Sequence, residues 1–186
     1  RINIHIYKNT CTVSLDSSGN SLHQRGYRIL TNIAPINEVL AAGLLLHSGW
    51  DGQTDFLDPM CGSGTFLIEA AMIACNIPAN INRSSYAFMH WNDYDGELYD
   101  KIVEASLKKV REFHHKIIGY DKAPSAVRKT QENVDHANLS DYISVERKDF
   151  FTSEKPVERK LHMVFNPPYG ERLPIEVEEF YGKIGD

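Results

Sequence analysis

The sequence has few cysteines and no long apolar run, and each shortage excludes a class of protein. Only three of the 186 residues are cysteines (Cys11, Cys61 and Cys75), and no CxxC pair is present, which argues against a disulfide scaffold and a structural zinc site. No run of 18 apolar residues occurs, so no transmembrane helix is predicted. We therefore expect a cytoplasmic protein with reduced thiols, no metal site and no membrane partner.

Positive charge is also scarce. Twenty Lys and Arg stand against 25 Asp and Glu, which gives a formal net charge of −5. This balance argues against a chain that binds nucleic acid by bulk charge alone, but it allows a nucleic-acid enzyme whose binding surface is local or on another domain. Candidates for phosphate contact, against the commoner solvated role, are Arg25, Arg28, Arg83 and Arg172.

Hydrophobic periodicity divides the chain into a β-rich start and an alternating α/β remainder. Ile2, Ile4 and Ile6 alternate with polar residues, as in a half-buried strand, and residues 11–16 predict its hairpin partner. Later strands are expected at 55–58, 116–121, 142–146 and 161–165, and helices at 35–47, 65–77, 97–113, 124–137 and from 176 onward. The apolar face of the helix at 35–47 is expected to contain Val39, Leu40, Gly43, Leu44 and Leu46. Residues 80–95 suggest an irregular insertion, and the alternation predicts a parallel sheet with helices on both faces.

A glycine-rich turn lies between the strand at 55–58 and the helix that follows it. It reads Asp58-Pro59-Met60-Cys61-Gly62-Ser63-Gly64-Thr65. In an open α/β sheet such a turn lies where ligands bind, and glycine lets a ligand approach the backbone closely. It is neither a Walker A loop nor a complete GxGxxG motif. The alternative is a tight turn that uses glycine for its geometry alone.

Two acidic residues follow the next strands. Asp121 ends the strand at 116–121 and could accept both hydroxyls of a ribose, although it lies farther from the glycine turn than the roughly 20 residues of a dinucleotide fold. Asp149, after the third strand, could accept from an adenine amino group with Phe150 against the ring. The alternatives are a helix cap and an ordinary turn residue.

The strongest motif, Asn166-Pro167-Pro168-Tyr169, ends the fourth strand. Proline cannot donate a backbone hydrogen bond, so the pair stops the strand and holds its carbonyls in fixed places. The Asn166 side-chain oxygen and the Pro167 carbonyl could accept from one amino group, and Tyr169 offers a face for a planar base. A rigid β-turn without function is the alternative.

Together these motifs resemble the S-adenosylmethionine-dependent amino-methyltransferases. The match is closest to the bacterial 23S rRNA guanine-N2 methyltransferases of the RlmL type, over residues 22–28, 34–38, 58–71 and 166–173, where Gly170-Glu171-Arg172 favours this branch. The resemblance implies methyl transfer from S-adenosylmethionine to the N2 amine of a guanine in RNA. It assigns cofactor binding to Asp58, Pro59, Met60, Cys61, Gly62, Gly64, Thr65, Asp121, Lys122, Asp149, Phe150 and Asn166, and catalysis to Asn166, Pro167, Pro168 and Tyr169.

The resemblance also implies a Rossmann-like class I methyltransferase fold with an RNA-binding THUMP domain before it. Residues 24–186 are then a methyltransferase domain that is incomplete at its C-terminal end, because only four of its strands are present. Residues 1–23 are a hairpin segment leading to the THUMP domain. Rivals are a tRNA guanine-N2 methyltransferase, a DNA adenine-N6 enzyme, a module that binds the cofactor without catalysis, and a nicotinamide dehydrogenase.

Overall fold

A computed structural model describes residues 1–31, 35–169 and 176–185. The strands are β1 (Ile2–Tyr7), β2 (Thr10–Leu15), β3 (Asp55–Asp58), β4 (Ile117–Asp121), β5 (Ile143–Arg147) and β6 (Leu161–Met163). The α-helices are α1 (Glu38–His47), α2 (Thr65–Ala74), α3 (Gly96–Leu107), α4 (Pro124–His136) and α5 (Val177–Gly185). Two short 3₁₀ helices are η1 (Ala87–His90) and η2 (Phe150–Thr152). None of the helices in these three ranges is both long and apolar enough to cross a membrane.

Four strands form the predicted parallel sheet, in the order β5-β4-β3-β6. Leu57 of β3 pairs with Ile118 of β4 on one side and with Met163 of β6 on the other, and both pairings are parallel. The carboxyl ends of all four strands therefore meet at one edge of the sheet, which is where the sequence motifs begin.

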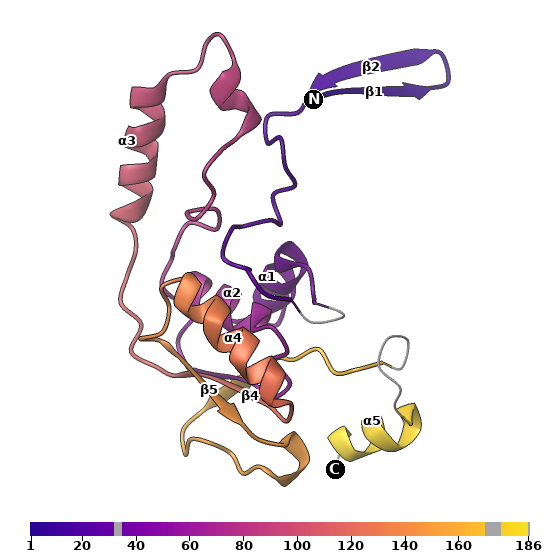
Figure 1. Cartoon of the computed structure of the whole chain (residues 1–186), viewed down its shortest axis with the longest axis vertical. Helices are drawn as coiled ribbons and strands as arrows, with labels where there is room; N and C mark the ends of the chain where they lie inside the picture. The colour runs from indigo at the N-terminus through magenta and orange to yellow at the C-terminus, as the bar shows by residue number, and fades with distance from the viewer. Residues whose placement is uncertain (32–34, 170–175, 186) are drawn as a thin grey trace.

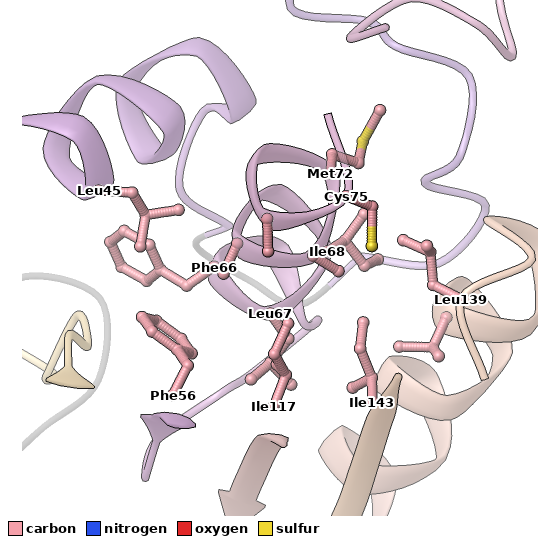
Figure 2. Packing of buried hydrophobic residues seen from close by; sticks show 14 of the residues in the cluster. Leu45, Phe56, Phe66, Leu67, Ile68, Met72, Cys75, Ile117, Leu139 and Ile143 are labelled. Carbon is pink, nitrogen blue, oxygen red and sulfur yellow. The ribbon is translucent and has the colours of Figure 1, made fainter. Parts of the chain in front are cut away.

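The main core lies between this sheet and the helices α1, α2 and α4 (Figure 1). Every residue of α2 except Ile73 is buried, as expected for a helix that is apolar on all sides. Figure 2 shows Leu67 of α2 lying over Ile117 of β4. We predicted helices on both faces of the sheet; on the opposite face Leu57, Ile118 and Tyr120 form a smaller cluster, against which the partly buried Val157 and Leu161 pack.

The face that α1 buries differs from the one predicted. The helix begins at Glu38 rather than Pro35, because the Asn37 side chain accepts hydrogen bonds from the backbone N–H groups of Val39 and Leu40 and caps it. Ala41 and Leu45 face the core, whereas four of the predicted apolar residues are exposed, namely Val39, Leu40, Leu44 and Leu46. Because α1 is apolar on nearly all sides, its hydrophobic periodicity does not identify which face is buried.

The predicted hairpin of β1 and β2 is present, but it is not half-buried. All twelve strand residues are exposed, and the hairpin extends away from the sheet (Figure 1). The register places Ile2 opposite Leu15 and Ile4 opposite Val13, so the apolar side chains share one face. The alternation correctly predicted the strands, but it could not show whether anything covers them.

Candidate active site

The strand-end motifs surround one cavity of about 590 Å³, within the size range of ligand pockets. Of the predicted site residues, the following line it: Asp58, Pro59, Met60, Cys61, Gly62, Thr65, Asp121, Lys122, Asp149, Phe150, Asn166, Pro167, Pro168 and Tyr169. Residues from four successive strand ends thus meet in a single site, as the sheet topology requires.

Gly64 is the one predicted cofactor-binding residue that does not line the cavity. Its φ of +82° is in the left-handed region, and a Cβ atom there would lie 2.7 Å from Cγ2 of Thr130 in α4. The nearby N–H of Gly62 donates to Asp121 Oδ2 at 3.1 Å, and this bond holds the turn to β4. Gly64 therefore lets α4 approach the turn closely, and its contact with a cofactor stays a prediction.

Asp58 is the most buried acid of the cavity lining, with 2% of its surface exposed. Its Oδ1 accepts a hydrogen bond of 3.1 Å from the Met60 N–H. Burial, and secondarily the negative charge of Asp121, raise the pKa of Asp58 to about 8. The carboxyl is therefore mostly protonated at neutral pH and would ionise readily beside a cation.

The two later acids also act as backbone caps. Asp121 accepts from the Gly62 N–H through Oδ2 and from the Ala123 N–H through Oδ1 at 2.9 Å. Asp149 accepts from the Phe151 N–H at 3.1 Å and caps η2. Each carboxylate oxygen has a second lone pair, so capping leaves acceptor capacity for a ligand. The capping and ligand-binding interpretations are compatible for both residues.

The Asn-Pro-Pro-Tyr motif lies at the open side of the cavity. Asn166 is exposed, its side-chain amide forms no hydrogen bond with any residue of the described ranges, and 48% of the Tyr169 surface is exposed. Pro167 and Pro168 are half-buried. An amide and an aromatic ring are thus both available to a ligand at the cavity mouth. Ala34 and residues 170–173, part of the predicted resemblance, lie outside the described residues.

Comparison with known proteins assigns the family. The model of the RMKL-like methyltransferase domain matches residues 25–186. The chain belongs to this family. It is 37% identical to the ribosomal RNA large subunit methyltransferase K/L of Vibrio campbellii, over 95% of the chain and 26% of that protein. The protein of the same name from Cellvibrio japonicus is also 37% identical, over the whole chain and 26% of that protein.

Solved structures confirm the predicted class I methyltransferase fold for this RMKL-like domain. SMU.472, described as a methyltransferase and complexed with SAH, is 34% identical with a TM-score of 0.89, over 99% of the chain and 48% of that structure. A methylase from Clostridium difficile 630 is 36% identical with a TM-score of 0.87, over the same shares. The chain thus spans about a quarter of the curated relatives and about half of the solved ones.

The RMKL-like domain also contributes pocket residues that the motifs did not reveal. Ser63 lies inside the glycine-rich turn without having been singled out, and Phe66 and Phe151 each directly follow a predicted residue, so reading each motif in full and one position further would have found them. Phe180 of α5 reaches the site through an edge-on contact with Phe151, with 5.3 Å between ring centroids. Pro35 and Ile36 belong to the stretch 34–38 that carries the family resemblance, whereas no sequence signal marks Ser125 and Lys129.

Two of the arginines proposed to contact phosphate have buried partners instead. Arg25 Nε lies 2.9 Å from Glu69 Oε1, which also accepts from the Tyr27 hydroxyl at 2.8 Å. Arg28 Nη2 donates to Thr65 Oγ1 and pairs through Nε with Glu38. Neither guanidinium is exposed enough to grasp a phosphate, which corrects the prediction for both; Arg172 lies outside the described residues.

Proposed function

We propose that this chain is the part of a 23S rRNA methyltransferase that transfers a methyl group from S-adenosylmethionine to the exocyclic N2 amine of a guanine. One observation carries the proposal. The Asn166-Pro167-Pro168-Tyr169 motif opens onto the same cavity as the strand-end acids Asp58, Asp121 and Asp149. The names of the curated relatives support ribosomal RNA as the substrate.

The cavity suits S-adenosylmethionine by its volume and by the chemistry of its lining. Asp121 would accept from the ribose hydroxyls, Asp149 from the adenine amino group, and the Phe150 ring would lie against the base. Asp58, buried and mostly protonated at neutral pH, would ionise beside the cationic methionyl end and supply its counter-charge. When bound, the cofactor supplies a methyl group made electrophilic by its sulfonium. The crystallisation of SMU.472 with SAH supports this choice.

In the proposed reaction, the exocyclic N2 amine of the guanine is oriented by the Asn166 side chain and the backbone carbonyl of Pro167. Such a nitrogen is a poor nucleophile, because its lone pair is delocalised into the base. Two acceptors on its two N–H bonds would direct the lone pair toward the methyl group, while Tyr169 stacks on the ring. Because the methylated amine loses its proton easily, catalysis is mainly positioning. A paired guanine would first have to leave its stack.

Residues 1–23 are proposed to lead to an RNA-recognising domain of the parent protein. The family model begins at residue 25, just after the hairpin segment, which supports a boundary there. A ribosomal RNA substrate would place the protein in the cytoplasm.

Two other substrates share the same chemistry. A tRNA guanine would present the same amine to Asn166. A neighbour from Listeria monocytogenes, 33% identical with a TM-score of 0.85, is described as a predicted N6-adenine-specific DNA methylase. Adenine N6 is also an exocyclic amine on a planar base. Mass spectrometry of rRNA, tRNA and DNA from a deletion strain would distinguish these substrates by which nucleoside loses its methyl group.

The test is Asn166→Ala in the full-length parent protein, assayed on unmethylated 23S rRNA from a deletion strain. We expect methylation to be lost while SAH affinity, measured by calorimetry, changes little, because Asp121, Asp149 and Phe150 make the main proposed contacts with the cofactor. Asn92→Ala removes an exposed amide outside the cavity and serves as the matched control. Full activity of Asn166→Ala would refute the assignment.

A further inference from the structure

Arg83, from the irregular insertion, binds the chain segment that follows the hairpin. Its Nη2 donates to the backbone carbonyls of Ser18 and Asn20, each at 2.8 Å, and its Nη1 donates to that of Ser21 at 3.1 Å. Its Nε donates to the carbonyl of Ser85 within the insertion. Three of the four acceptors thus belong to the segment 16–21 and one to the insertion, so a single guanidinium joins the two.

Other contacts extend the same joint. The N–H groups of Ala87 and Phe88 donate to the carbonyls of Ser18 and Ser17, at 3.3 and 3.1 Å. The Asp16 carboxylate accepts from the N–H of Ser18 and folds the segment into a turn. Figure 1 shows the segment after β2 running beside the region of η1. The insertion is therefore not a free loop, because it forms the surface against which residues 16–21 pack.

Gly26 continues the contact toward the sheet. Its φ is +93°, and a Cβ atom there would lie 2.6 Å from the carbonyl oxygen of Asn82. Only glycine lets the two backbones approach this closely. Residues 16–26 thus contact the insertion at both ends.

Beyond Gly26 the segment is fastened to the glycine turn of the cavity. Arg28 donates to Thr65 Oγ1, at the first residue of α2. The Asn133 side chain of α4 accepts from the N–H groups of Ile29 and Leu30, and it donates to the carbonyl of Ser63 in the turn. From the hairpin to the cavity, the segment is held by backbone and side-chain contacts with the methyltransferase domain.

We propose that Arg83 is a positioning residue that locks residues 16–21 onto the insertion. It thereby holds the part of the parent protein connected through the hairpin at a fixed place relative to the cavity. The statement about RNA rests on the proposed function: an RNA bound by that part would be presented to Asn166 at a set distance. The insertion would then act as a spacer between recognition and chemistry.

The experiment compares Arg83→Ala, Arg83→Lys and Arg128→Ala in the full-length parent protein. Arg128 is an exposed arginine whose described ion pair is with Glu132 one helical turn away, so it controls for the loss of a guanidinium. Hydrogen–deuterium exchange of peptides covering residues 16–24 reports on the joint itself. Steady-state methylation of 23S rRNA and calorimetry with SAH report on substrate presentation and on the cavity.

For Arg83→Ala we expect faster exchange in residues 16–24 and a KM for rRNA raised about tenfold, because a loose tether lowers the effective concentration of RNA at the cavity. The kcat at saturating RNA and the affinity for SAH should change less than twofold, whereas general misfolding would lower both. Arg83→Lys keeps the charge but cannot reach four carbonyls, so it should give an intermediate result.

Unchanged hydrogen–deuterium exchange of residues 16–24 in Arg83→Ala would refute the claim that Arg83 holds residues 16–21 on the insertion. Faster exchange with unchanged kinetics, or with kcat and SAH affinity lost together, would overturn the positioning role. If the wild-type parent methylated no RNA, the proposed function would fail, and the exchange data alone would decide whether Arg83 anchors the segment.

Discussion

Replacing the buried acid Asp58 with asparagine should change how the stability of the protein depends on pH. The unfolded carboxyl has a pKa of 3.8, and burial raises the native pKa to about 8. Between these values the native state holds a proton that the unfolded state has released. The free energy of unfolding therefore decreases as pH rises through this window, and the cost is complete above the native pKa.

The magnitude follows from the size of the shift. Each pH unit within the window costs the native state about 1.4 kcal/mol, so the whole interval is worth on the order of 5 kcal/mol. Asparagine has nearly the same shape, does not titrate, and can keep the 3.1 Å hydrogen bond from the Met60 N–H. We expect Asp58→Asn to match the wild type near pH 4 and to exceed its stability by several kcal/mol at pH 8.

The assay is urea denaturation of both proteins from pH 4 to pH 9, and the informative quantity is the difference curve. Titrating groups that are not coupled to Asp58, including Glu69, are common to the two proteins and cancel. Asp93→Asn, at an exposed acid outside the cavity, shows the effect of removing a surface carboxylate. Parallel pH profiles for Asp58→Asn and the wild type would refute the buried, protonated carboxyl.

Two further substitutions, one of them with a matched control, test the glycine-rich turn and the acid Asp121 that is hydrogen-bonded to it. Gly64→Ala places a Cβ atom 2.7 Å from Thr130 at a φ of +82°, so it should lower stability by about 2–4 kcal/mol in thermal denaturation, whereas Gly43→Ala, whose Cβ meets open space in α1, should raise it by about 0.5–1 kcal/mol. Equal effects would contradict the geometry of the turn. Asp121→Ala removes the acceptor for Gly62 and Ala123 and the proposed ribose contact, so calorimetry should show SAH affinity reduced about tenfold or more. Unchanged affinity would exclude the ribose role.

The sheet and most of the cavity could be predicted from the sequence because their signals are local. The strand at 55–58 matches β3, and the helix predicted at 124–137 differs from α4 by one residue. Parallel strands then bring their carboxyl ends to one edge, so motifs far apart in the chain meet without any knowledge of packing. Membership of the RMKL-like family confirms the resemblance on which the fold was predicted.

Features decided by long-range packing could not be predicted in the same way. Gly64 has the same sequence signal as Gly62, and only the structure shows that Gly62 lines the cavity whereas Gly64 lies against Thr130. The exposed side of α1 could not be deduced because its residues are apolar on several sides. The position of Phe180 in the cavity depends on how α5 returns to the strand ends, which periodicity does not encode.

The arginines show most clearly how composition alone can mislead. Counted as surface charge, Arg25, Arg28 and Arg83 are three of the twenty basic residues and would offer sites for phosphate. In the structure Arg25 and Arg28 pair with buried acids and Arg83 binds carbonyls, so these three hold the segment between the hairpin and the cavity. Under the proposed function, the electrostatic attraction to an RNA backbone would therefore have to come from residues other than these three.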